Sequence, residues 1–106
     1  MLAERGIMKL NTVIFSEEEL SRIRERTDNG QITLTVNLHG MSTKNARRFL
    51  KNLIALNAGT FNINVIHGFN HGCSIKEMLR NSFISSRIIG VDDVLYNEGM
   101  TVLKIT

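Results

Sequence analysis

The chain has 106 residues, of which 42% are hydrophobic and 22% are charged, and these values are typical of one soluble globular domain. No apolar run is long enough for a transmembrane helix, and the N-terminal residues do not resemble a signal peptide. A single cysteine excludes an internal disulfide, so we expect a cytoplasmic protein. The formal net charge of +3 is uneven, because residues 1–30 hold five Lys/Arg and six Asp/Glu whereas residues 31–106 hold eight and four. This mild basic excess favours a polyanionic partner such as nucleic acid and gives no reason to expect a membrane partner.

Residues 1–30 are predicted to form an N-terminal extension with one helix, preceding a domain over residues 31–106. Ser16 and Glu19 form a capping box, in which each side chain accepts a hydrogen bond from a backbone N–H at the start of a helix. We expect this helix to run to the turn-forming residues 28–30, and we expect it to serve as the surface for a protein partner or a homodimer. Met8 is an alternative start to Met1, in which case the preceding residues are a leader.

The rest of the chain alternates between strand and helix patterns. The predicted elements are, in order, a strand (32–38), a helix (43–57), a strand (61–66), a helix opened by a Ser74–Glu77 capping box (74–83), and two strands (91–96 and 100–105). We expect Asn97-Glu98-Gly99 to be a hairpin loop with the glycine in the left-handed conformation. The sequence therefore predicts an α/β fold, an α+β two-layer sandwich in which a β-α-β-α-β-β unit builds a four-stranded mixed sheet.

Two His-Gly motifs each follow a predicted strand and precede a predicted helix. They are Val-Asn-Leu-His-Gly-Met at 36–41 and Ile-His-Gly-Phe-Asn-His-Gly at 66–72. The carboxyl ends of parallel strands lie at one edge of a sheet, so both motifs should meet there. Imidazole exchanges protons near neutral pH, so we expect His39 and His67 to be the catalytic residues of any phosphodiester cleavage. The alternative is that these histidines only stabilise tight turns.

Residues around the two motifs are predicted to bind phosphate. Glycines let a ligand approach the main chain, the free amides at a helix N-terminus favour an anion, and lysines add positive charge. The predicted substrate-binding residues are Asn37, Gly40, Lys44, Gly68, Asn70, His71, Gly72 and Lys76, and Arg80 could extend this basic surface.

No metal-binding residues are predicted. Three histidines and Cys73 are present, but they lack His-x-x-His or Cys-x-x-Cys spacing. A divalent metal cofactor is therefore not indicated by ligand spacing. Cys73 fits a small apolar residue at a helix start better than a nucleophile.

The two motifs, their spacing and the order of elements resemble the Smr (small MutS-related) domain family. Typical members carry Leu-Asp-x-His-Gly after the first strand and His-Gly-x-Gly after the second, and the similarity covers about residues 32–105. The resemblance implies a β-α-β-α-β-β fold whose last strand runs antiparallel, nucleic acid as the ligand, and DNA-nicking or RNA endonuclease activity. It maps the site onto Asn37, His39, His67 and Gly68.

Two positions depart from the family pattern. Asn37 occupies the acidic position, and Asn70 occupies the position of the second glycine. Asparagine keeps an acceptor oxygen but carries no charge and is no base. The leading interpretation is a nucleic-acid-binding domain with endonuclease activity, and the alternative is a catalytically inactive adaptor that binds a protein or the ribosome.

Overall fold

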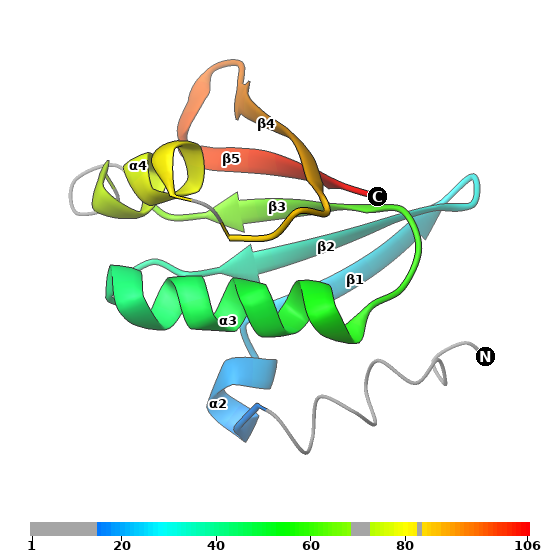
Figure 1. Ribbon diagram of the computed structural model, residues 1–106, viewed down its shortest axis with the longest axis horizontal. Helices are drawn as coiled ribbons and strands as arrows, with labels where there is room; N and C mark the ends of the chain where they lie inside the picture. The colour runs from blue at the N-terminus through cyan, green and yellow to red at the C-terminus, as the bar shows by residue number, and fades with distance from the viewer. Residues whose placement is uncertain (1–14, 69–72, 83) are drawn as a thin grey trace.

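Figure 1 shows the computed structural model, which describes residues 15–68, 73–82 and 84–106. The elements are α2 (Glu17–Leu20), β1 (Ile23–Asp28), β2 (Gln31–Asn37), α3 (Thr43–Leu56), β3 (Phe61–Ile66), α4 (Cys73–Asn81), β4 (Ile88–Val94) and β5 (Asn97–Ile105). The strands form one five-stranded sheet in the order β1-β2-β3-β5-β4. Strands β2 and β3 pair in parallel, and the other neighbouring strands pair antiparallel.

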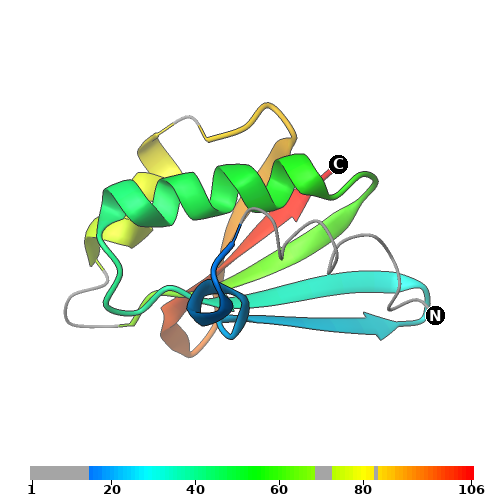
Figure 2. The same cartoon turned by 90° about the horizontal axis from the view of Figure 1, so that it is seen from below.

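Helices α3 and α4 lie on one face of this sheet, so the fold has two layers (Figure 2). The predicted α+β class with a mixed sheet is confirmed, and the sheet has one strand more than predicted. None of the helices in the described part of the chain is long and apolar enough to cross a membrane.

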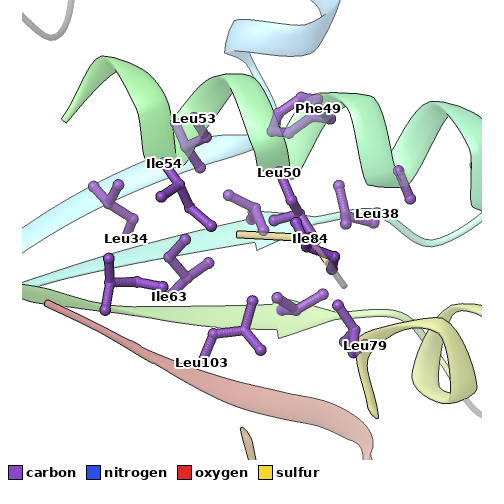
Figure 3. Close-up of a cluster of buried hydrophobic side chains, with 14 of the residues drawn as sticks. Leu34, Leu38, Phe49, Leu50, Leu53, Ile54, Ile63, Leu79, Ile84 and Leu103 are labelled. Carbon is purple, nitrogen blue, oxygen red and sulfur yellow. The ribbon is translucent and has the colours of Figure 1, made fainter. Parts of the chain in front are cut away.

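The core lies between α3 and the inward-facing side chains of the sheet. Alternate residues of β2 and β3 face the helices, as strand geometry requires, and the apolar side of α3 is fully buried against them (Figure 3). The buried residues include Leu34, Val36, Leu38, Phe49, Leu50, Leu53, Ile54, Phe61, Ile63, Val65, Leu79, Ile84, Leu103 and Ile105.

The prediction of one helix from Ser16 to about residue 28 is wrong. The capping box forms, but α2 ends at Leu20 and the next residues form β1, an edge strand paired with β2. Asn29 and Gly30 both have positive φ angles, 53° and 80°, as a two-residue hairpin of the primed type requires. The pairing of residues 23–28 with β2 therefore outweighs the tendency of these residues to continue the helix. Through β1 and Phe15, whose ring stacks on Phe49, residues 15–30 contribute to the same sheet and core.

Two further local predictions are corrected. Ser74 lies inside α4, which begins at Cys73, so Ser74 is not the N-cap residue of a capping box. The final hairpin turns at Leu95 and Tyr96 rather than at residues 97–99. Gly99 does not have a positive φ angle, because it belongs to β5, where its carbonyl accepts hydrogen bonds from the loop after β3.

Candidate functional site

Both His-Gly motifs lie at the edge of the sheet where β2 and β3 end. Asn37 and Ile66 are paired in register, and the N–H of Leu38 donates to the carbonyl of Ile66 at 2.8 Å. The His39 ring lies against the backbone of Gly68, so close that a methyl group on Gly68 would sit 2.4 Å from the ring carbon Cδ2. The expected meeting of the two motifs at one edge is confirmed. We call residues 37–42, 67–68 and 95–99 the loop edge.

Backbone contacts fix the first turn of the loop edge. The Asn37 side-chain oxygen accepts a hydrogen bond from the N–H of His39 at 3.1 Å, and the N–H of Met41 donates to Leu38 at 3.0 Å. Gly40 completes the turn with a φ of 86°, which glycine adopts most readily. Asn37 therefore shapes the turn through its acceptor oxygen, which an aspartate would also supply.

Arg22 stabilises this turn by donating hydrogen bonds to its carbonyls, and it was not identified in the sequence analysis. Its Nη1 donates to the Asn37 carbonyl at 2.8 Å and, more distantly, to the His39 carbonyl at 3.5 Å. Its Nε donates to Glu18 at 2.9 Å, so α2 holds the guanidinium in place. The Asn-Gly sequence at 29–30 was the signal that could have revealed this contact, because a hairpin there brings Arg22 beside the end of β2.

A second contact joins α2 to α3. Glu19 accepts a hydrogen bond from Arg48 at 3.1 Å, in addition to the bond from the Ser16 N–H that closes the capping box. The backbone hydrogen bond from Ser16 lowers the pKa of Glu19 below its usual value of 4.5, and the Arg48 guanidinium lowers it further. The charged form of Glu19 therefore stabilises the position of α2.

His67 is a buried part of the scaffold. Its side chain is 1% exposed, with Nε2 2.9 Å from the Thr101 hydroxyl and Nδ1 3.0 Å from the Gly68 carbonyl. A carbonyl only accepts, so Nδ1 donates to Gly68, and Nε2 forms the second hydrogen bond with the Thr101 hydroxyl. The backbone N–H groups of His67 and Gly68 both donate to the Gly99 carbonyl. His67 thus attaches the loop after β3 to β5, with both ring nitrogens occupied.

His39 has the opposite environment, because its side chain is exposed. Within residues 15–68, 73–82 and 84–106, no group forms a hydrogen bond with its ring nitrogens. Gly68 has a φ of 88° and its backbone contacts the His39 ring, so this position requires glycine for both its conformation and its size. Among the described residues, the His39 nitrogens are therefore left without a partner.

Positive charge lies along α3, beginning next to the loop edge. Lys44 lies in the first turn of α3, directly after the first motif, and is exposed. A surface depression of about 350 Å³ is lined by Lys44, Arg47, Arg48, Lys51 and Asn52. On α4, Lys76 is half-buried, and Arg80 forms an ion pair with Asp93. Lys44 therefore places a positive charge next to the loop edge, while Asp93 engages Arg80.

Three of the predicted binding residues, Asn70, His71 and Gly72, lie outside the described residues. In the part of the chain that the structure describes, no three His, Cys, Asp or Glu side chains gather as a metal site would need. No protein-family model matches the chain, and no curated protein matches it. The resemblance to the Smr family therefore stays a prediction from the motifs and the element order.

Proposed function

We propose that this chain is a divergent Smr-type domain that binds the phosphate backbone of a nucleic acid at the loop edge. One observation carries the proposal: the exposed His39 ring lies directly on the Gly68 backbone, so the two His-Gly motifs form one surface. The N–H groups of His39, Met41 and Gly68 are bonded inside the domain, so in the proposal the His39 ring and nearby ammonium groups contact the oxygens of the phosphate.

The cations of α3 support the same ligand. Lys44 lies in the first turn of α3, directly after the first motif, and four more basic or amide side chains of the depression follow along the helix. Such cations attract a polyanion over distance and release counterions when it binds, which makes the affinity depend on salt. Contacts to phosphate position a nucleic acid without reading its sequence.

The geometry favours binding over cleavage. Phosphodiester cleavage by acid–base chemistry needs groups that reach the reacting atoms, and His39 has this exposure whereas His67 is buried with both nitrogens bonded. Asn37 offers no carboxylate beside His39. In the proposal, His67 is a positioning residue that holds Gly68 against the His39 ring.

Fluorescence anisotropy with labelled RNA and DNA oligonucleotides tests the binding function. We expect affinity to fall as salt rises, with Lys44→Gln lowering the slope of log affinity against log salt by about one. Lys104→Gln is the matched control, because it removes the same charge far from the loop edge, where Lys104 pairs with Asp92. Salt-independent affinity, or equal effects of the two variants, would contradict the proposal.

Asn37→Asp tests whether cleavage has been lost from this site. The new carboxylate can keep the hydrogen bond from the His39 N–H and adds a charge beside the ring. Cleavage by Asn37→Asp that disappears in Asn37→Asp/His39→Ala would identify a decayed nuclease. Cleavage by the wild-type chain that disappears with His39→Ala would instead identify an active endonuclease.

A further inference from the structure

Tyr96 is an exposed aromatic residue with an unusual backbone conformation. It lies at the tip of the β4–β5 hairpin, is 97% exposed, and has a positive φ of 65°. Glycine and asparagine adopt this left-handed conformation readily, whereas a bulky aromatic residue is strained there. Within the described residues, no hydrogen bond or ring contact engages the Tyr96 side chain. Among the described residues, no such contact of the Tyr96 side chain offsets the backbone strain. Strained residues of this kind cluster at functional sites.

The hairpin tip belongs to the loop edge. Met100 of β5 pairs with Ile66, and the Gly99 carbonyl accepts from the N–H groups of His67 and Gly68 at 2.9 and 3.1 Å. Strand β4 runs in the same direction as β2 and β3, so its end lies at the same edge of the sheet (Figure 1). Neighbouring strands are about 4.8 Å apart, which separates the tip from the His39 turn by roughly two to three strand spacings.

We infer that Tyr96 stacks on an unpaired base of a single-stranded nucleic acid whose phosphates are held at His39 and Lys44. This inference rests on the proposed phosphate-binding function. Exposed aromatic rings bind single strands by stacking, because bases that have left a helix present a free face. Bases inside a duplex are covered by their neighbours, so a ring at a hairpin tip selects unpaired strands.

The surroundings favour a nucleic acid over a protein partner for this ring. The imidazole of His39 and the exposed amine of Lys44 belong to the same end of the sheet. Of the acidic residues of the hairpin, Asp92 pairs with Lys104 and Asp93 pairs with Arg80, whereas Glu98 is exposed. The ring and the Lys44 amine therefore lie at the same end of the sheet, where one strand can place a base on the ring and a neighbouring phosphate at the amine.

The composition of the chain supplies a direct probe. Tyr96 is the only tyrosine and there is no tryptophan, so intrinsic tyrosine fluorescence reports on this residue alone. We would titrate the chain with a single-stranded RNA or DNA, with its duplex, and with an abasic single strand of equal charge. We expect quenching by the base-carrying single strand and no quenching by the abasic strand, although the abasic strand still binds.

Variants measure the contribution of the ring. Tyr96→Ala should weaken single-strand affinity by about 5- to 150-fold, the range of one base stacked on an aromatic residue, and should leave abasic-strand affinity unchanged. Tyr96→Asn suits the positive φ, so it keeps the turn and should lose the same affinity. Tyr96→Phe should retain it. Leu95→Ala is the matched control, since this neighbour is 77% exposed but not aromatic.

Two results overturn the inference and remain distinguishable. If the abasic strand binds with salt-dependent affinity while Tyr96→Ala and Tyr96→Asn bind the base-carrying strand like wild type, stacking is wrong and phosphate binding stands. The exposed tip would then belong to a protein partner. If no strand binds the wild-type chain, both the phosphate-binding function and the stacking inference are wrong.

Discussion

An arginine stabilises each end of the sheet, but the two ends differ in what they leave exposed. At the end of the sheet opposite the loop edge, the Arg87 guanidinium donates four hydrogen bonds to carbonyl groups. Its central carbon also lies 5.8 Å from the centre of the Phe61 ring. The four acceptors are the carbonyls of Ile54, Asn57, Gly59 and Thr106. Arg87 thus adds donors to the carbonyls of Ile54 and Asn57 at the end of α3, where a helix has few N–H partners of its own.

At the loop edge, Arg22 also donates to backbone carbonyls, yet the side chains beyond it point to solvent. His39, Lys44 and Tyr96 are exposed there. The comparison teaches that internal hydrogen bonds close one end of the sheet, whereas the other end leaves side chains exposed, as the proposed binding function requires. Substitutions at the opposite edge should therefore reduce stability and spare binding, whereas exposed residues of the loop edge should show the reverse.

Arg87→Ala should have the largest effect on stability. It removes the donor to four carbonyls and the packing on Phe61, so we expect the free energy of unfolding to fall by about 3 kcal/mol. Urea denaturation measures this change. Arg87→Lys should recover less than half of it, because an ammonium group cannot replace the planar fork. Nucleic-acid affinity of the folded variant should match wild type, and weaker binding with unchanged stability would refute the comparison.

His67→Ala should follow, at about 2 to 3 kcal/mol, because it leaves the buried Thr101 hydroxyl without its partner. Thr101→Val removes the other side of this contact, and a double-mutant cycle should give a coupling of about 1 kcal/mol. His39→Ala is the matched control, which we expect to change stability by less than about 0.5 kcal/mol. A His67→Ala variant of normal stability that had lost cleavage would instead make His67 a catalytic residue.

The burial of His67 and the exposure of His39 could have been predicted from the strand alternation. In β3, Phe61, Ile63 and Val65 face the core, and His67 continues this series. After β2 the inward series ends with Leu38, so His39 falls on the other side. The motif pattern alone treats the two residues as equivalent, whereas their positions in the alternation do not.

The first strand was harder to predict than the rest of the fold. Helix α3 and strand β3 combine a strong apolar pattern with burial, so their positions follow from the sequence. Strand β1 lies at the sheet edge and is mostly exposed, so Arg24, Glu25 and Arg26 resemble a solvated helix surface. Strand β1 forms because it pairs with β2, and the pattern within residues 23–28 does not reveal this pairing. The only local signal for it is the hairpin sequence Asn29-Gly30.

Two glycines with the same φ of 88° offer a matched comparison between the edges. At Gly59, near Arg87, an added Cβ meets nothing within 4 Å, whereas at Gly68 it lies 2.4 Å from the His39 ring. Gly59→Ala should therefore cost only the backbone strain, about 1 kcal/mol, and should not change binding. Gly68→Ala should cost about 2 kcal/mol and displace His39, lowering nucleic-acid affinity about tenfold. Equal effects on affinity would show that the contact between His39 and Gly68 does not matter for binding.

The smallest effect should come from Glu19, which holds α2 and therefore Arg22 at the loop edge. The hydrogen bond from the Ser16 N–H and the Arg48 guanidinium lower its pKa below 4.5 in the folded chain. The resulting stabilisation is therefore present above about pH 4.5 and disappears as the pH falls through the folded-state pKa.

Glu19→Gln should lower the free energy of unfolding at pH 7 by less than about 1 kcal/mol. The difference from wild type should shrink toward pH 3, as measured by urea denaturation at several pH values. Glu17→Gln removes the same charge from the same turn of α2 without these contacts, so it separates their effect from a general charge effect. A Glu19→Gln difference that grew on acidification would have the wrong sign for a carboxylate with a lowered pKa, and would show that Glu19 does not hold α2 against α3.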